Sequence, residues 1–174
     1  MPNSSQYRGT RRELYEIGRE RRGAPRQNKV KLYFKLDESV RTGLDGLAQS
    51  LPNLQVTQSE LAGLGVLLLG YRLDRMAAAL GRHDRILPAG VVDLEALYLI
   101  WNLEFPADRA GRGTTVYLRP EQAVRLGEIR SRLRLQIRVT QAELVNLGLT
   151  VLLTLVNRIA GDVERRTIRD EAEL

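Results

Sequence analysis

Two stretches of the chain begin with alternating apolar and polar positions. In the first, Leu32, Phe34 and Leu36 fall on one side of an extended segment. In the second, Val116 and Leu118 repeat the pattern, 82 positions after Phe34 and Leu36. An alternation with a period of two predicts a short strand with one apolar side. We therefore expect two strands, which begin near positions 31 and 113.

Apolar residues at helical spacing follow each predicted strand. They are Val40, Leu44, Leu47 and Leu51 in one stretch and Val124, Leu126, Ile129 and Leu133 in the other. Asp37 suits the N-cap of the first helix, and Pro120 suits the first position of the second, where its missing N–H costs nothing. Pro52-Asn53 marks the end of the first helix. A strand followed by an amphipathic helix is therefore predicted twice.

A six-residue phrase then recurs. VTQSEL occupies 56–61 and VTQAEL occupies 139–144, at an offset of 83. Both fit the capping box Ser/Thr-x-x-Glu/Gln, in which the two side chains satisfy amides at the start of a helix. The helices that follow, about 58–76 and 141–160, are apolar nearly all round, which predicts burial. A unit of about 45 residues cannot bury such a helix alone, so two units must wrap around each other or around another copy.

The remaining segments complete the domain organisation. Residues 77–112 contain a predicted helix at about 91–105, which either packs on the core or joins two copies; its Trp101 is expected to be a packing residue. The glycines of the buried helices are expected where backbones approach closely; they are Gly63, Gly65, Gly70 and Gly148. The expected division is a basic arm (1–30), a first unit (31–76), a linker (77–112), a second unit (113–160) and a C-terminal tail or short helix (161–174).

The net charge of +6 lies entirely near the N-terminus. Residues 1–31 hold nine Lys and Arg against three acids, whereas residues 32–174 hold 18 of each sign. A basic arm ahead of a neutral body favours a polyanionic partner such as nucleic acid, although a solvated tail has the same composition. The arm residues that could contact nucleic acid are Arg8, Arg11, Arg12, Arg19, Arg21, Arg22, Arg26 and Lys29.

Several classes of protein are disfavoured by the composition. The chain has no cysteine and one histidine, His83, so we expect neither a metal centre nor a cofactor. We also expect no enzyme, because no Walker-type glycine-rich loop or catalytic cluster occurs. The N-terminus has no apolar signal-like segment, and no apolar run approaches the roughly 20 residues of a membrane span. A cytoplasmic protein is therefore expected.

The order strand, helix and capped buried helix, occurring twice, resembles the ribbon-helix-helix family of DNA-binding proteins, the Arc/MetJ/CopG type. Leu32-Tyr-Phe-Lys-Leu-Asp-Glu-Ser-Val40 is especially similar to the CopG-type strand and first helical turn. The resemblance implies a mainly α fold in which one strand from each unit forms a two-stranded antiparallel β-ribbon that enters the major groove. Both units lie in one chain, as in TraY-type conjugation proteins, so it implies an intrachain pseudodimer with an extra helix in the connecting segment.

The resemblance also implies roles for particular residues. Strand residues that face away from the helices would contact bases: Lys31, Tyr33 and Lys35, and Gly113, Thr115 and Tyr117. The start of the second helix of each unit would bind backbone phosphates through Thr57, Gln58, Thr140 and Gln141. Gly113 offers no side chain, so an asymmetric recognition sequence is expected. Without the resemblance, these positions are an ordinary solvent-facing strand and two helix caps.

A basic run, Arg130, Arg132, Arg134 and Arg138, lies near the second inter-helix loop and is either a DNA contact or a solvated face. The expected function is sequence-specific binding of double-stranded DNA, nucleoid-associated, as a transcriptional repressor or other regulator, or as a plasmid partition, copy-control or relaxosome accessory factor. The alternative is an antitoxin-like or scaffold protein whose main role is to bind a protein partner. Its docking surfaces would be 91–105 and 161–174, and 91–105 would also serve any self-association of pseudodimers.

Overall fold

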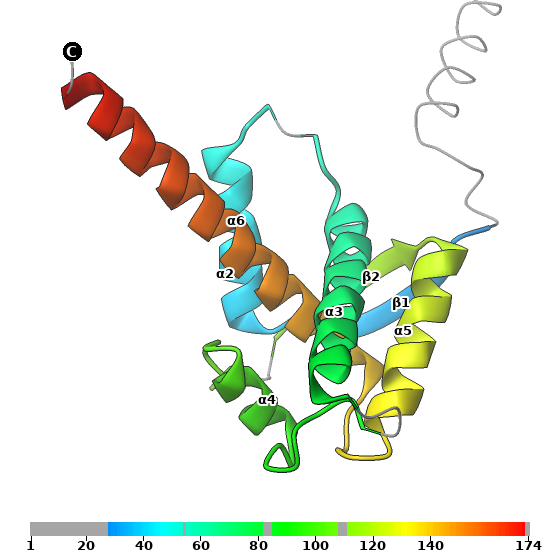
Figure 1. Cartoon of the computed structure of the whole chain (residues 1–174). Coiled ribbons are helices and arrows are strands. Elements are labelled where there is room, and N and C mark those ends of the chain that lie inside the picture. The colour runs from blue at the N-terminus through cyan, green and yellow to red at the C-terminus, as the bar shows by residue number, and fades with distance from the viewer. Residues whose placement is uncertain (1–27, 54, 82–84, 108–110, 173–174) are drawn as a thin grey trace, which may run out of the picture.

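The computed structural model describes residues 28–53, 55–81, 85–107 and 111–172, with side chains described as far as Asp162. Its elements are β1 (Val30–Lys35), α2 (Glu38–Ser50), α3 (Gln58–Leu80), α4 (Leu94–Ile100), β2 (Gly113–Leu118), α5 (Pro120–Leu133) and α6 (Gln141–Ala172). Figure 1 shows their arrangement. The described chain is mainly helical with one two-stranded antiparallel sheet, which confirms the coarse fold class predicted from the sequence.

The two strands pair along their whole length. Val30 lies opposite Leu118, Tyr33 opposite Thr115, and Lys35 opposite Gly113. The side of this ribbon that faces the helices is apolar, because Phe34, Val116 and Leu118 are buried there. Side chains alternate across a strand, so the pairing leaves the other side of the ribbon without a helical cover.

The helices α3 and α6 cross at a pair of glycines (Figure 1). A Cβ on Gly65 would lie 2.8 Å from the backbone carbonyl carbon of Gly148, and a Cβ on Gly148 would lie 2.7 Å from the carbonyl oxygen of Gly65. Such distances are too short for any side chain. The predicted close approach of backbones is confirmed at these two positions, and the crossing forms the centre of one apolar core.

Gly70 has a different use from the one predicted, because it makes room for a side chain rather than for a backbone. A Cβ on Gly70 would lie 2.6 Å from Nε of Arg125 on α5. The guanidinium of Arg125 forms an ion pair with Asp74 of α3, and Arg132 reaches the same carboxylate at 3.1 Å. These contacts hold α5 against α3.

Both predicted capping boxes are present. The N–H of Thr57 donates to Glu60 Oε2 at 2.9 Å, and the N–H of Glu60 donates to Thr57 Oγ1 at 3.2 Å. Thr140 and Glu143 make the same pair of bonds at 2.8 and 3.2 Å. Pro120 is the first residue of α5, as predicted. The starts of α3, α5 and α6 could therefore be located from local sequence.

The start of α2 is held differently from the prediction. Asp37 occupies the N-cap position, but its side chain makes no capping hydrogen bond. Its backbone N–H instead donates at 2.8 Å to Oδ1 of the buried Asn146. The Asn146 amide group also donates to the carbonyl oxygens of Lys35 and Ala142, each at 3.0 Å. One α6 side chain thus joins the end of β1 to the start of α2.

In the second half, a different side chain accepts the hydrogen bond at the start of the corresponding helix, α5. The backbone N–H of Arg119 donates to Gln122 Oε1 at 3.0 Å. The Gln122 side chain lies over Gly63, where an added Cβ would be 2.3 Å from that oxygen. Gly63, like Gly70, therefore makes room for a side chain of α5.

The predicted linker helix at 91–105 is too long, since α4 spans only Leu94–Ile100. Asp93 caps it by accepting from the N–H of Ala96 at 2.7 Å. Asn102 ends it with φ of 54°, and the N–H of Leu103 returns to Tyr98 O at 2.9 Å. A left-handed residue followed by this bond is a common helix ending, usually built with glycine.

Both long helices extend past their predicted ends. α3 continues to Leu80 and ends at Gly81, which has φ of 61°. α6 continues to Ala172 through the segment expected to be a separate tail, and it projects from the body (Figure 1). By length and composition one described helix, over Gln141–Asp162, could cross a membrane, but half of its apolar window is buried within the protein. That burial fits a core helix.

Candidate nucleic-acid interface

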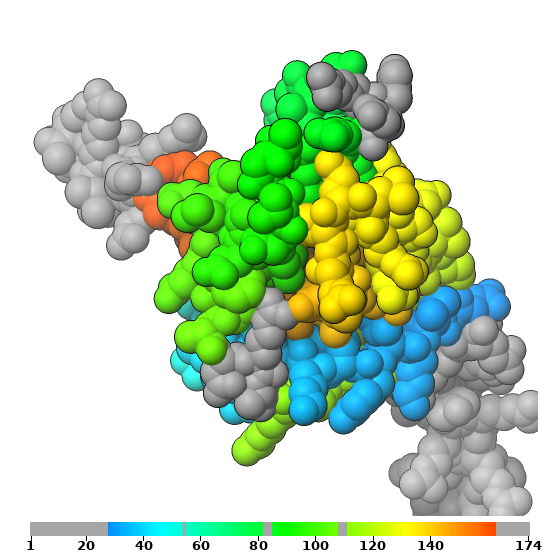
Figure 2. Space-filling model, turned by 90° about the horizontal axis from the view of Figure 1, so that it is seen from below, coloured from blue at the N-terminus to red at the C-terminus, as the bar shows by residue number. Residues whose placement is uncertain are grey.

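All six residues predicted to contact bases lie on one side of the ribbon. The register places Lys31 opposite Tyr117, Tyr33 opposite Thr115, and Lys35 opposite Gly113. Tyr33 is 70% exposed, Thr115 is half-buried, and the other four are exposed. Figure 2 shows β1, in blue, along the lower border of the body with helices on one side of it. The ribbon therefore presents these side chains together, across both strands, to solvent.

Gly113 leaves space on this surface for a side chain of the other strand. A Cβ on Gly113 would lie 2.0 Å from the hydroxyl oxygen of Tyr33 and 2.6 Å from Cζ of its ring. The Tyr33 side chain thus crosses the ribbon and lies over the glycine. The space that the second strand leaves open is occupied by a side chain of the first strand.

The segments that form the ribbon carry only positive charge. Residues 29–36 contain three lysines, residues 111–119 contain two arginines, and neither segment contains an acid. Lys31, Lys35, Arg112 and Arg119 are exposed. The carboxylate of Asp37, the next residue along, is buried. A ribbon edge of one sign attracts a polyanion.

The second helix of each half contacts the ribbon. At the start of α3, Ser59 Oγ accepts from the N–H of Tyr117 at 2.9 Å, and Gln58 Oε1 accepts from Thr114 Oγ1 at 3.1 Å. In the second turn of α6, Asn146 donates to the carbonyl oxygen of Lys35, the last residue of β1. The start of α3 therefore lies beside β2, whereas α6 meets the end of β1, so the second helix of each half contacts the strand of the other half.

Most of the polar side chains at these helix starts already make hydrogen bonds within the protein. Both threonines accept the amide of the third helical residue, and the Thr140 hydroxyl also lies 3.1 Å from Glu143 Oε2 as a donor. Gln58 is engaged by β2, whereas Gln141 is half-buried. The capping boxes use the amides of the N-cap and third residues, which leaves those of the first two helical residues as donors for an anion. The phosphate role of Thr57, Gln58, Thr140 and Gln141 stays a prediction.

Two residues of this interface were missed from the sequence. Ser59 is the one letter by which VTQSEL differs from VTQAEL, and it is the side chain that bonds the ribbon. That difference was visible, but its meaning depended on knowing which strand lies beside α3. Arg112 precedes β2, and its carbonyl oxygen accepts from the N–H of Leu36.

The other basic groups predicted from the sequence divide into three. The arm residues Arg8, Arg11, Arg12, Arg19, Arg21, Arg22 and Arg26 lie outside the described residues, and Lys29 is half-buried before β1. Arg132 is used in the ion pair with Asp74, and Nε of the half-buried Arg130 lies inside without a partner among the described residues. Arg134 and Arg138 are exposed.

The linker helix packs by one side only. Leu94, Leu97 and Tyr98 are buried, and Trp101 is covered by the Arg72 guanidinium at 5.2 Å from the ring centre. Burial and the nearby Arg158 charge lower the pKa of Arg72. The predicted packing role of Trp101 is confirmed. Leu99 and Ile100 on the outer side of α4 are exposed, as is Val92 just before the helix. The use of this surface by a second copy or a protein partner stays a prediction.

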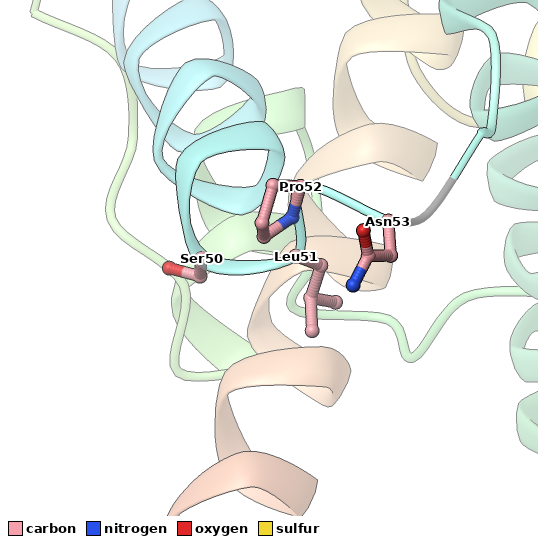
Figure 3. A pocket seen from close by; sticks show the side chains of 4 residues that line it. All are labelled: Ser50, Leu51, Pro52 and Asn53. Carbon is pink, nitrogen blue, oxygen red and sulfur yellow. The ribbon is translucent and has the colours of Figure 1, made fainter.

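Two hollows lie near the turn after α2. One, of about 360 Å³, is bordered by Ser50, Leu51, Pro52 and Asn53 (Figure 3). The other, of about 270 Å³, is lined mainly by apolar side chains of α2 and α3. Within the described residues no group of three or more metal-ligating side chains occurs.

Comparisons with protein-family models, with curated proteins and with solved structures find no match for this chain.

Proposed function

We propose that this protein binds double-stranded DNA with its β-ribbon in the major groove, as a tandem ribbon-helix-helix protein. The observation that carries the proposal is the register, which aligns Lys31, Tyr33 and Lys35 with Tyr117, Thr115 and Gly113 on one exposed, positively charged side. A major groove about 12 Å wide admits a two-stranded ribbon. The protein's cellular role would be that of a transcriptional regulator or of a mobile-element accessory factor.

Two independent contacts support the pseudodimer part of the proposal. Tyr33 and Thr115 are aligned positions at the offset of 82, and they face each other in the ribbon. Gly65 and Gly148 are aligned at the offset of 83, and they touch where α3 crosses α6. Contacts between equivalent positions are what a twofold relation between two units requires, so both points support an axis that runs through the ribbon and the helix crossing.

The residue chemistry suits base reading. A lysine ammonium can donate to guanine O6 and N7, and threonine can donate, accept, or place its methyl group against thymine. The amides at the starts of α3 and α6 would meet phosphates on either side, which would set the register of the ribbon without reading sequence. Both lysines belong to β1, so the first half would supply more of the discrimination and the preferred site would be asymmetric.

Selection from a random duplex pool tests the function. The intact chain should enrich a defined sequence, and the double variant Lys35→Ala, Tyr33→Ala should lose that enrichment while keeping its fold by circular dichroism. Arg85→Ala is the control, because it removes one exposed positive charge outside the ribbon. Enrichment of nothing over random DNA by the intact chain would overturn the proposal, as would a double variant that selects the same sequence equally well.

Salt dependence tests the arm. If arm residues neutralise phosphates, the logarithm of affinity should fall with the logarithm of salt concentration by about 0.9 per phosphate. Deletion of residues 1–28 should then make the slope shallower. The same slope with and without the arm would restrict binding to the ribbon and the helix starts.

A further inference from the structure

The apolar hollow between α2 and the start of α3 has a counterpart in the second half of the chain. The hollow has a volume of about 270 Å³ and is lined by five large apolar side chains. They are Leu44, Leu47, Leu51, Val56 and Leu61, which align at the offsets of 82 and 83 with Leu126, Ile129, Leu133, Val139 and Leu144. The same apolar site therefore occurs twice in one chain.

The two sites differ in how well they are covered. In the second half all five side chains are buried, and none is more than 4% exposed. In the first half Leu51 and Val56 are 44% and 38% exposed, and the other three are half-buried. Ala48 also lines the hollow where the second half has Arg130, so the first site has fewer side-chain atoms of its own to fill it. An open apolar surface of this kind marks an interaction site.

A segment of the linker lies over the end of α5 in the second half. Ile86 and Leu87 are buried and belong to the same apolar cluster as Leu133 and Ile137. Figure 2 shows the linker, in green, against the yellow turn that follows α5. The side chain of Gln136 holds the linker backbone. Its Oε1 accepts from the N–H groups of Ile86 and Leu87 at 2.9 and 3.1 Å, and its Nε2 donates to Leu87 O at 3.2 Å.

The first half has a similar side-chain amide at the corresponding place. Asn53 aligns with Gln136, and an aliphatic residue follows each of them, Leu54 in the first half and Ile137 in the second. Asn53 is exposed beside Leu51 at the edge of the neighbouring hollow (Figure 3). Asparagine and glutamine carry the same amide donor and acceptor. The first site therefore offers an apolar hollow together with a group that can bind a peptide backbone.

The charge at the hollow indicates the class of its partner. Among the described residues that line it, Asp45 is the only charged one, and it is exposed. An apolar site with a negative charge does not attract nucleic acid, but it suits a peptide that carries a positive residue beside its aliphatic pair. The linker segment itself has this order, Arg85-Ile86-Leu87.

We infer that the hollow between α2 and α3 binds a short segment of a partner protein, in which two aliphatic residues follow a basic one. The aliphatic pair fills the apolar hollow, and Asn53 binds the peptide backbone, as in other sites where main-chain hydrogen bonds give affinity and pockets give specificity. The arm residues aligned with Ile86-Leu87 are the polar Asn3-Ser4. A second copy already binds its own pair through Gln136. The occupant is therefore a different protein.

Thiol labelling in the presence of a peptide tests the site, because the chain has no cysteine of its own. The probe is the peptide of residues 85–91 with both ends capped, whose Kd is measured by fluorescence anisotropy on the unsubstituted chain. Leu51→Cys lies at the hollow and Leu64→Cys lies on α3 outside it, with parent side chains 44% and 50% exposed. At about ten times its Kd, the peptide should slow the reaction of Leu51→Cys about tenfold and leave Leu64→Cys unchanged. Val56→Cys repeats the measurement in case the Leu51 substitution weakens the site.

Variants of the peptide and of the chain identify the contacts. A peptide with Ile86→Asp and Leu87→Asp should give no protection. Asn53→Ala should weaken peptide binding about fivefold, as the loss of one hydrogen bond does, whereas Asn53→Gln should keep the affinity because it supplies the amide that the second half uses. Asp45→Asn should weaken binding about twofold, because an exposed ion pair contributes little.

Unchanged labelling of both Leu51→Cys and Val56→Cys at peptide concentrations up to several millimolar would overturn the proposal. Equal protection by the aspartate peptide would overturn it too. Labelling that is slow without peptide would also count against it, since acceleration by deletion of residues 1–27 would identify the arm as the occupant and acceleration by dilution would identify a second copy. None of these measurements involves DNA, so failure of this site and failure of the proposed function are distinguishable.

Discussion

The half formed by β1, α2 and α3 and the half formed by β2, α5 and α6 share one element order, but different side chains fill the same spaces. Gly43 of α2 leaves room for Leu153 of α6, whose Cδ1 would lie 2.7 Å from an added Cβ. In the other half the large and the small residue are exchanged. Arg125 of α5 aligns with Gly43, and Gly70 of α3 aligns with Leu153. A close helix contact thus requires one small partner, and either helix can supply it.

The helix starts differ in the same way. Asn146 reaches from α6 to the start of α2, whereas Gln122 closes the start of its own helix above Gly63. The first solution is buried and joins three elements, and the second is exposed and local. The shared fold therefore fixes where a hydrogen-bond acceptor is needed, but not which residue provides it.

The largest expected effect comes from the crossing of α3 and α6, where Gly65 and its aligned residue Gly148 meet. Gly148→Val places a branched side chain against the Gly65 backbone, where no flexible group can move aside. The free energy of unfolding should fall by about 3 kcal/mol or more, as overpacking of a tight helix contact does. Thermal and denaturant unfolding followed by circular dichroism measure it.

Gly46→Ala is the matched control, because a Cβ at this position of α2 meets nothing within 4 Å. It should stabilise the chain by about 0.5–1 kcal/mol, since alanine restricts the unfolded state more than glycine. Unfolding of Gly148→Val at the wild-type midpoint would disprove the central crossing.

The next effect compares the two helix starts directly. Asn146→Ala leaves the N–H of Asp37 and the carbonyl of Lys35 in the interior without this partner, so stability should fall by about 2–3 kcal/mol. Gln122→Ala exposes the N–H of Arg119 to water, which can replace the lost acceptor, so the loss should be about 1 kcal/mol or less. Urea titrations of the two variants give the difference. Equal losses would show that the two halves depend on their caps to the same degree.

These comparisons indicate what the sequence can and cannot predict. The strands and the capped helices follow from local signals. Apolar and polar positions alternate with a period of two in the strands, and the partners of the Thr-x-x-Glu capping box lie only three residues apart. Asn146 could not be assigned, because its bonds to Asp37 and Lys35 span 109 and 111 residues. For the same reason the sequence shows only that Gly113 offers no side chain. Its use depends on Tyr33 of the other strand, so it emerges only from the register.

A smaller effect compares the two strands as DNA readers, on the sequence that the intact chain selects. Lys35→Ala should weaken binding about tenfold, which is about 1.4 kcal/mol, because a lysine contact with a guanine edge and its charge are both lost. Thr115→Ala removes a neutral, half-buried hydroxyl and should weaken binding about threefold or less. Equilibrium binding at fixed salt decides between them. A greater loss of affinity for Thr115→Ala would show that the second strand contributes most of the discrimination between DNA sequences.

The smallest effect tests the contact that links the two strands on the exposed face. Gly113→Ala forces the Tyr33 ring away, but the ring end is flexible, so stability should change by less than about 1 kcal/mol. The displaced tyrosine should change the affinity for DNA. In a chain that already carries Tyr33→Ala, Gly113→Ala should no longer have this effect. A double-mutant cycle should therefore give a coupling of about 0.5–1 kcal/mol in DNA affinity. Strict additivity would mean that the glycine affects binding independently of Tyr33, and the two strands would then read DNA separately.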